Sequence, residues 1–246
     1  MIYDRINLFL PTRKRVENGK LPRYLKSVMD TVSDYKNVVL TFLVDTDDVE
    51  TEMYLYLNKE LKCEFEIISN YKLKTPHLGK FYNILYEQTK FSDPKILVSM
   101  TGDDFVFVTK NWDLEILRNI NDMNGVGIVH CKDGIQNGRV AVNLFTTRKW
   151  INMIGGKFMC ELFPADFIDT LHTEIARRTG HERYLEKVSI IHEHSGLSSP
   201  DTYDETFKRL RNVYNEEYSG KNLTHILESQ VALALNSINS CVTAAA

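Results

Sequence analysis

Short apolar runs of strand length alternate with helical patterns along the N-terminal part of this chain. The apolar runs cover residues 6–10, 38–44, 65–69 and 96–100, and apolar residues at helical spacing mark residues 21–35, 49–61 and 80–90 between them. Strands that alternate with helices form βαβ crossovers, which build a mainly parallel sheet with helices on both faces. The alternation therefore predicts a Rossmann-type α/β fold.

The rest of the chain follows a less regular pattern. Strands are predicted at residues 127–131 and 140–146, which pair through a turn at 132–134, and at 184–192; helices are predicted at 112–119, 169–179, 203–218 and 223–238. This pattern predicts a smaller half with a mixed or antiparallel sheet, followed by C-terminal helices. Because no repeat or linker interrupts the sequence, one domain is expected over residues 1–246.

The composition is ordinary for a globular protein. Of the 246 residues, 43% are hydrophobic and 26% are charged, and the formal net charge is −3. This charge gives no global attraction to nucleic acid or anionic lipid, although it is compatible with a local basic patch. No apolar run has the length of a signal peptide or a membrane span, and Cys63, Cys131, Cys160 and Cys241 lack metal-binding spacing. We therefore expect a cytoplasmic protein with reduced cysteines, in the host cytoplasm if the chain is viral.

Two adjacent acids follow the predicted buried strand at residues 96–100. Gly102, Asp103 and Asp104 separate this strand from a second apolar run at 105–107. Two carboxylates held close together repel unless a cation or hydrogen-bond donors offset their charge, and Mg²⁺ or Mn²⁺ prefers such oxygen ligands. The alternative is a polar turn in which these residues have only a structural role. Both interpretations are open at this point.

Further polar clusters follow the other predicted strands. They lie at residues 11–15, 45–48 and 69–71. In open parallel sheets, ligands bind in the crevice beyond the carboxyl ends of the strands. The sequence therefore predicts that one rim of the sheet carries the functional residues.

Histidines and acids of the second half are further candidates. His192 and His194 follow the strand at 184–192, and an imidazole can complete the coordination of a Mn²⁺ ion held by a carboxylate. Asp166, Asp169 and Glu174 lie before or within the helix at 169–179, where an acid facing the crevice can act as a general base. The alternatives are a histidine that bonds backbone at a strand end and an acid that only caps its helix.

Basic residues near the predicted rim are candidates for contact with phosphate. Arg13, Lys14 and Arg15 follow the first strand, and arginine can engage phosphate with two hydrogen bonds. Lys80 follows Gly79 at the start of a helix, where a phosphate or sugar can approach closely. A solvated basic loop and a plain helix start are the alternatives, and for Lys14 we favour the solvated loop.

The order of these motifs resembles that of a GT-A-type glycosyltransferase of the broad family-2-like group, including transferases of the viral or phage type. The matching segments are residues 8–13 (LFLPTR), 44–48 (VDTDD), 69–71 (SNY), 79–83 (GKFYN) and 102–104 (GDD), then Asp169 eleven residues before Gly180, and His192 with His194. The resemblance covers roughly residues 5–196. It implies a nucleotide-binding half at 1–105, an acceptor and catalytic half at 106–200 and C-terminal helices at 201–246.

The resemblance also implies the chemistry. It suggests a metal-dependent, inverting transfer of a sugar from a nucleotide-diphosphate donor, with a UDP-sugar favoured, to an acceptor hydroxyl. Mn²⁺ or Mg²⁺ would bridge the diphosphate. Such a transfer needs a cation to stabilise the leaving diphosphate and a base aimed at the acceptor hydroxyl.

The resemblance assigns roles to individual residues. Near the base and ribose of the donor it places Pro11, Thr12, Arg13, Asp45 and Asn70. Near the diphosphate or donor sugar it places Lys80, and at the metal or ribose Asp103. Metal ligands would be Asp104 with His192 or His194, and the general base would be Asp169, with Asp166 and Glu174 as alternatives. The chain departs from the usual pattern in two places, because it has Gly-Asp-Asp where many members have Asp-x-Asp and a single acid at Asp169 where a pair is usual.

Other functions remain as alternatives. A non-catalytic nucleotide- or sugar-binding module would have the same fold, and a nucleotidyltransferase would share the sheet but needs a glycine-rich phosphate loop that residues 11–16 lack. The short chain and its βαβ start argue against an RNA polymerase palm. The acceptor is open between a saccharide, a protein and a hydroxymethylated DNA base, for which Arg139, Arg148, Lys149, Lys157, Arg177 and Arg178 are candidate phosphate contacts. We expect a monomer, or a homodimer through the last helix, and no membrane partner.

Overall fold

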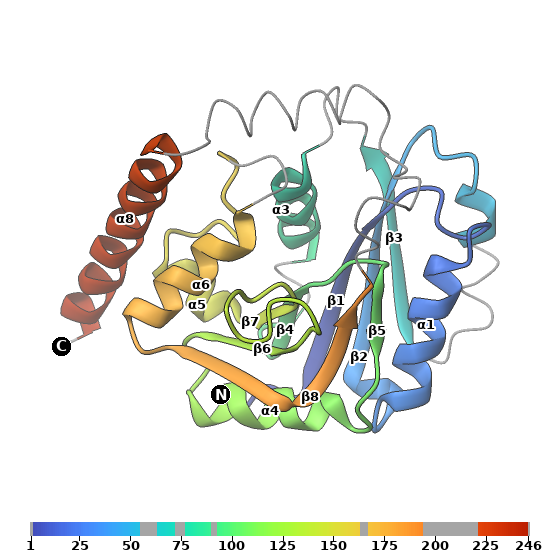
Figure 1. Ribbon diagram of the computed structural model, residues 1–246, viewed down its shortest axis with the longest axis horizontal. Helices are drawn as coiled ribbons and strands as arrows, with labels where there is room; N and C mark the ends of the chain where they lie inside the picture. Colours follow the sequence, from blue (N-terminus) through green and yellow to red (C-terminus); the bar gives the residue numbers. More distant parts are fainter. Residues whose placement is uncertain are drawn as a thin grey trace.

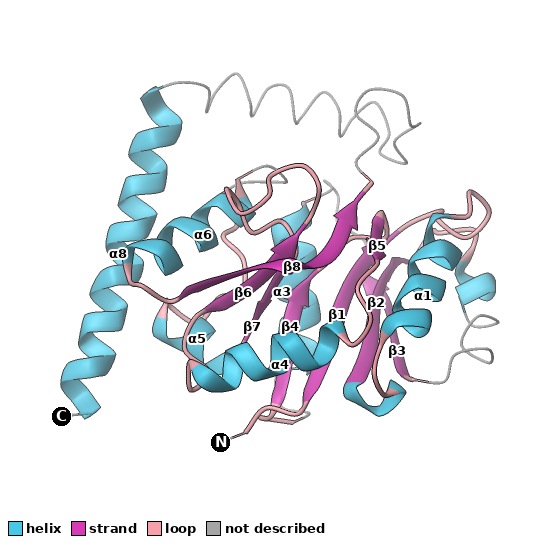
Figure 2. Cartoon of the chain, turned by 60° about the horizontal axis from the view of Figure 1, so that its bottom comes forward, coloured by secondary structure: helices cyan, strands magenta, loops and turns pink. Residues whose placement is uncertain are grey.

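The computed structural model describes residues 2–54, 63–71, 77–89, 93–162, 167–193 and 221–245. Its centre is an eight-stranded mixed sheet with the strand order β3-β2-β1-β4-β7-β6-β8-β5. Helices lie on both sides of this sheet (Figures 1 and 2). The predicted α/β class, with a parallel part and a mixed part, is confirmed. The division of the chain at residues 105 and 200 stays a prediction.

The N-terminal half is a parallel βαβ array. Its strands are β1 (Arg5–Thr12), β2 (Val38–Asp45), β3 (Glu64–Tyr71) and β4 (Ile96–Met100), and its helices are α1 (Lys20–Thr31), the short 3₁₀ helix η1 (Tyr35–Asn37) and α3 (Leu78–Thr89). β1 pairs in parallel with β2 on one side and with β4 on the other. The four predicted strands are thus confirmed. Of the helix predicted at 49–61, Thr51–Tyr54 is helical and the rest lies outside the described residues.

β1 is apolar on both faces because the sheet buries both. Ile6, Leu8 and Leu10 point into a core formed with α1 and α4 (Trp112–Asp122). Phe9 points into the opposite core, formed with α3, α5 (Arg148–Met153), α6 (Ile168–Arg178) and α8 (Lys221–Ala245). Strands covered on two faces have continuous apolar runs, which explains the pattern that predicted them.

The second half extends the sheet with short strands of mixed direction. β5 (Phe105–Phe107), β6 (Ile128–Lys132), β7 (Leu144–Thr146) and β8 (Glu182–His192) follow. β7 is antiparallel to β4 and β6, β8 is parallel to β6, and β5 is antiparallel to β8. The predicted pairing of residues 127–131 with 140–146 is confirmed. The second strand, however, begins at Leu144, because the buried side chain of Asn143 takes the place of the backbone hydrogen bonds there. Its Oδ1 accepts from the Cys131 amide (2.7 Å), and its Nδ2 donates to the Ile190 carbonyl (3.2 Å).

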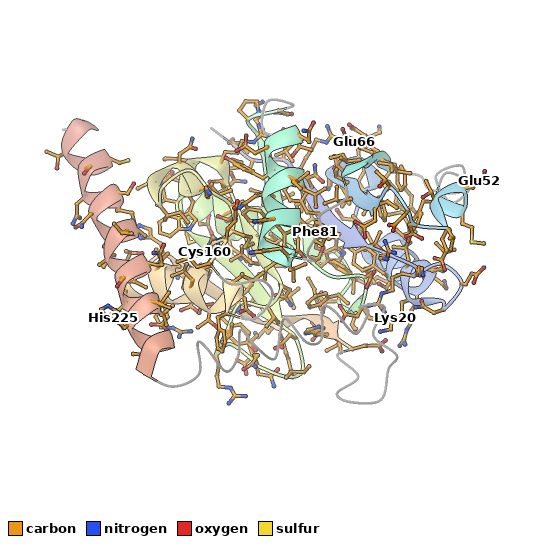
Figure 3. All side chains as sticks on the ribbon, turned by 90° about the horizontal axis from the view of Figure 1, so that it is seen from above. Lys20, Glu52, Glu66, Phe81, Cys160 and His225 are labelled. Carbon is orange, nitrogen blue, oxygen red and sulfur yellow. The ribbon has the colours of Figure 1, made fainter. Side chains whose placement is uncertain are left out.

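The C-terminal helix α8 packs on α6 and α5 at one end of the molecule. Viewed from above in Figure 3, His225 of α8 and Lys20 of α1 lie on opposite sides of the molecule. The helix continues to Ala245, beyond the predicted end at residue 238, whereas the helix predicted at 203–218 lies outside the described residues. None of the described helices combines the length and the apolar character needed to cross a bilayer. The oligomeric state stays a prediction.

Candidate functional site

The predicted rim brings together acids from two elements and their partners. Asp103, three residues after the end of β4, is buried and accepts a hydrogen bond from the Thr12 hydroxyl at the end of β1 (2.7 Å). Arg15 lies with its Nε 3.4 Å from the same carboxylate oxygen and is itself buried. Burial raises the pKa of Asp103 to about 6, against the opposing effects of Arg15 and Thr12. These contacts commit the Asp103 carboxylate to partners within the protein.

Asp104 has a different environment. Its Oδ2 lies 3.3 Å from Nε2 of His192, the last residue of β8. Burial alone would raise the pKa of Asp104, but the hydrogen bond and charge of His192 outweigh it and hold that pKa below its usual range. Both side chains are about one-fifth exposed. The structure thus joins two residues 88 positions apart into one carboxylate–imidazole pair.

The end of β8 is fixed from two sides. The amide of His192 donates to the Asp133 carbonyl (2.9 Å), and the amide of Glu193 donates to the Asp104 carbonyl (2.8 Å). The Glu193 carboxylate also pairs with Arg23 of α1 at 2.6 Å. Because the backbone on either side of the imidazole is bonded, the position of His192 follows from the sheet rather than from a mobile loop.

A steric constraint explains why residue 102 is a glycine. A Cβ at this position would lie 2.5 Å from Oδ1 of Asp104 and 3.3 Å from the Phe105 ring. Real side chains do not tolerate the first distance, so any other residue here would displace the carboxylate. The glycine of the Gly-Asp-Asp motif therefore admits the Asp104 side chain.

The acidic loop after β2 binds the basic loop after β1. Arg13 donates from its NH1 group to Asp45 (2.8 Å) and to Asp47 (2.6 Å). The hydrogen bond to Asp47 raises the pKa of Arg13, which stays charged. Arg13 and Asp45, both predicted to border the donor, thus lie together at the rim. Pro11, which was also predicted to border the donor, is the penultimate residue of β1 and pairs with Leu43 of β2.

Two buried acids whose contacts were not predicted from the sequence shape the same loop. Asp48 accepts from the amide of Lys14 (3.0 Å), which has a left-handed backbone (φ 51°), and from the Tyr54 hydroxyl (3.1 Å). Glu50 accepts from the amide of Val16 (2.7 Å). Carboxylates that accept backbone N–H bonds are strongly directional partners. They hold the turn from which Arg15 reaches Asp103.

Lys80 lies in the first turn of α3, with its side chain exposed. The amide of Lys80 donates to Nδ1 of His77 (3.3 Å), and the other ring nitrogen of His77 lies 3.0 Å from the Glu161 carbonyl. Burial lowers the pKa of His77, so the neutral ring accepts at Nδ1 and donates at Nε2. Lys80 is therefore available at a helix start that a histidine caps.

The segment before α6 is fixed against α3. The Asn83 side chain donates to the Met159 carbonyl (2.9 Å) and accepts from the Met159 amide (2.7 Å), and His172 of α6 contacts the Phe158 carbonyl. In Figure 3, Cys160 of this segment lies between Phe81 of α3 and the helix α8. The segment leads toward the start of α6, where the candidate bases were predicted.

Asp169 occupies the first turn of α6 and is half-buried. Its Oδ1 accepts from the Thr170 amide (2.7 Å). Figure 1 shows that α6 begins on the side of the sheet toward which the arrows of β1 and β3 point. Glu174 lies further along the helix, where its carboxylate pairs with Arg177 and Arg178.

The side chains of three predicted site residues are not among those described. Asp166 and His194 lie outside the described residues, and of Asn70, in β3, only the backbone is described. Among the residues that the structure does describe, no three His, Cys, Asp or Glu side chains converge as a metal site. In the described part of the rim, the candidate ligands for a cation are therefore the paired side chains of Asp104 and His192.

The six basic side chains considered for DNA contact are engaged within the protein. Arg148, Lys149 and Arg139 bond to backbone carbonyls, Lys157 pairs with Glu161, and Arg177 and Arg178 pair with acids that include Glu182 and Glu228. The acids offset the charge of Lys157, Arg177 and Arg178, whereas Arg148, Lys149 and Arg139 keep their charge but use hydrogen-bond donors within the protein. None of the four cysteines, all of them in the described ranges, forms a disulfide.

Comparisons with known proteins show what the fold is similar to. No known family's sequence model matches the chain, and no curated protein sequence matches it. Among solved structures, a mannosyltransferase from Pyrobaculum calidifontis in complex with GDP-Man and Mn²⁺ superposes with a TM-score of 0.62 at 12% identity, over 100% of this chain and 76% of that one.

Two further structures give the same result. TarS 1–349 of S. aureus in complex with UDP-GlcNAc has a TM-score of 0.57 at 14% identity, over 96% of this chain and 73% of that one. Against a longer TarS structure the match spans 43% of that chain. Glucosyl-3-phosphoglycerate synthase from Mycobacterium tuberculosis has a TM-score of 0.53 at 12% identity, over 79% of this chain and 74% of that one. The eight-stranded mixed sheet and its helices thus have the GT-A-like fold that the sequence predicted.

Proposed function

We propose that this protein is a metal-dependent, inverting glycosyltransferase that takes a sugar from a nucleotide-diphosphate donor. The observation that carries the proposal is the pair formed by Asp104 and His192 at the carboxyl edge of a GT-A-like sheet. The solved relatives in fold include complexes with GDP-Man and Mn²⁺ and with UDP-GlcNAc. For this chain we favour a UDP-sugar and Mn²⁺ or Mg²⁺.

The geometry of the pair suits a small divalent cation. Ligands about 2.1 Å from an octahedral cation lie about 3 Å apart when they are neighbours. The separation of 3.3 Å between Asp104 Oδ2 and His192 Nε2 is close to that value. A carboxylate and an imidazole together form an acceptable donor set for Mn²⁺.

Two protein ligands leave most of an octahedral shell to other donors. A cation here would use oxygens of the donor diphosphate, so we expect metal and nucleotide to bind together. When bound, the metal ion stabilises the charge that grows on the leaving diphosphate. Asp103, committed to Thr12 and Arg15, is not assigned to the metal; its place after β4 suits an indirect role in shaping the donor site.

The remaining residues fit the two ends of the donor. Pro11, Arg13 and Asp45 border the expected nucleoside position, and Lys80 at the start of α3 is a cation for the diphosphate or sugar. We assign the general base to Asp169, because α6 begins at the carboxyl side of the sheet (Figure 1) and the Glu174 carboxylate already pairs with two arginines. His194 and Asp166 stay candidates for the metal and the base.

Ligand-dependent thermal unfolding tests the donor site. A ligand that binds only the folded state raises the unfolding temperature. We expect UDP or GDP with Mn²⁺ to raise it and either component alone to have little effect. Asp104→Asn should abolish the combined shift, whereas Asp122→Asn, an exposed acid of α4, should keep it. If wild-type protein shows no shift with any nucleotide and hydrolyses no nucleotide sugar, the enzyme proposal is wrong and a binding module of this fold becomes the better interpretation.

The assignment of the base is tested separately. Asp169→Asn should leave Mn²⁺-dependent UDP binding within about twofold of wild type, since general bases do not contact the diphosphate, and should lower turnover by about 10²-fold or more. Glu174→Gln, one helical turn further on, is the matched control. Equal losses in both variants would contradict the assignment.

The acceptor is proposed only as a class. Three of the six basic side chains of the acceptor half pair with acids and the other three donate to backbone carbonyls, so we favour a saccharide or protein hydroxyl over a hydroxymethylated DNA base. Binding to DNA carried by phosphate contacts would fall steeply with added salt. Strong, salt-sensitive binding to DNA in a titration between low and moderate salt would overturn this preference.

A further inference from the structure

The imidazole of His192 has a partner on its flat face. The ring of Phe105 lies parallel to it, with centroids 4.4 Å apart and an angle of 15° between the planes. Phe105 is the residue directly after Asp104, so one side chain covers the imidazole face while its neighbour meets the imidazole edge. This arrangement leaves the ring nitrogens at the rim.

The sheet register creates this stack. β5 and β8 are antiparallel, and Phe105 pairs with His192 across them. Side chains of directly opposite residues lie on the same face of a sheet, close enough for rings to touch. The adjoining hydrogen bond from the Glu193 amide to the Asp104 carbonyl fixes the same register. A shift by one residue would separate His192 from both Asp104 and Phe105.

Phe105 itself has little freedom. It is 4% exposed and belongs to the core formed by α1, α4 and one face of the sheet. Because Gly102 has no side chain, there is room beside it for the edge of the Phe105 ring and for the Asp104 carboxylate. A buried aromatic ring held in this way is a rigid surface, and it restrains the face of an imidazole that is one-fifth exposed and whose edge contacts Asp104.

We propose that Phe105 is a positioning residue for the metal site: its ring holds the His192 imidazole in the plane that directs Nε2 toward the cation beside Asp104. This inference rests on the proposed function and adds a residue that does not touch the metal or the donor. Without the ring, the imidazole loses one of its restraints, so more of its ordering has to accompany cation binding, and that ordering costs free energy. Partners outside the ligand shell commonly change metal affinity by about 10- to 100-fold.

The test measures Mn²⁺ binding directly, without an acceptor. Free Mn²⁺ is followed by electron paramagnetic resonance in a titration of the protein saturated with UDP. In Phe105→Leu we expect roughly tenfold weaker Mn²⁺ binding, at the lower end of the range for such partners. Phe105→Tyr keeps the stacked ring and should stay within about twofold of wild type.

Phe107→Leu is the matched control, because Phe107 lies in the same strand, is 2% exposed and contacts Tyr24 and Trp112 instead of a candidate ligand. It should lose comparable stability and keep its Mn²⁺ affinity. The inference is overturned if Phe105→Leu binds Mn²⁺ as tightly as wild type, or if Phe107→Leu loses as much Mn²⁺ affinity as Phe105→Leu. If Phe105→Leu does not fold, Phe105→Met takes its place. A wild-type protein whose UDP complex binds no Mn²⁺ contradicts the proposed function itself.

Discussion

At the scale of single residues, two neighbouring acids have opposite environments. Asp103 is enclosed with Thr12 and Arg15, and its pKa is raised to about 6 because burial dominates. Asp104 is held below its usual pKa, since the effect of His192 outweighs that of burial. The sequence motif presents them as equivalent, but their surroundings separate a structural carboxylate from one that is available to a cation.

Asp103 should make folding sensitive to pH. Its folded-state pKa is raised above the unfolded value of about 3.9, so its ionisation opposes folding; this cost is absent below the unfolded pKa and fully present above the folded one. Relative to wild type, Asp103→Asn should therefore gain roughly 2 kcal/mol of unfolding free energy between pH 4 and pH 7. Urea unfolding at several pH values measures this difference. A difference that does not change with pH would show that the carboxyl titrates normally.

At the scale of elements, the sequence predicted the strands and helices whose faces are fully buried. β1, β2 and β4 were recognisable because both faces of a parallel strand are apolar, and α1 because its apolar residues share one face. α5 was missed: it is a short helix whose hydrogen bonds begin at the cap formed by Thr147, and six residues give too little periodicity to detect.

Part of the site was also predictable from the sequence, because its residues follow recognisable strands. Asp104 and His192 were expected to converge because both follow strands, and the β5–β8 register brings them together. The supporting roles of Arg15, Asp48, Phe105 and Asp133 were not predicted: Arg15 was expected to contact phosphate, and Asp48 was named only as part of an acidic cluster. Their roles depend on contacts across the fold, such as the bond from the His192 amide to the Asp133 carbonyl, and spacing in the sequence carries no information on these.

Asn143 should account for much of the cohesion between β6 and β8. Its buried amide satisfies the Cys131 amide and the Ile190 carbonyl, so Asn143→Ala leaves two buried backbone groups without their partner. We expect a loss of about 2–4 kcal/mol in unfolding free energy, measured by urea denaturation. Asn152→Ala, at an exposed position of α5, should change stability by no more than about 0.5 kcal/mol. Similar values for both would contradict the role given to Asn143.

At the scale of the whole molecule, the sheet has a core on each face, and the two cores have different functions. The core with α1 and α4 contains Phe105, whose ring stacks on His192 of the proposed metal-site pair. The opposite core contains α3 and α6, which position Lys80 and Asp169, and it extends to α8 through Val231, Ala234 and Ile238. The residues proposed for the donor and for the base therefore depend on packing on both sides of one sheet.

If α8 belongs to this second core, loosening its contact should destabilise the molecule as one unit. Ile238 is 7% exposed and belongs to the core that α8 shares with α5 and α6, whereas Leu233 of the same helix is 61% exposed. Ile238→Ala should lower the unfolding free energy by about 2–4 kcal/mol, since it removes buried methyl groups and leaves a cavity. Leu233→Ala should change it by no more than about 0.5 kcal/mol. Circular dichroism and tryptophan fluorescence should report the same shifted transition for Ile238→Ala, because small cooperative units unfold in one step. If the fluorescence transition of the two buried tryptophans, Trp112 and Trp150, keeps its midpoint while the helical signal shifts, α8 unfolds independently, and its contact with α5 and α6 contributes nothing to holding α6, which carries the proposed base, in place.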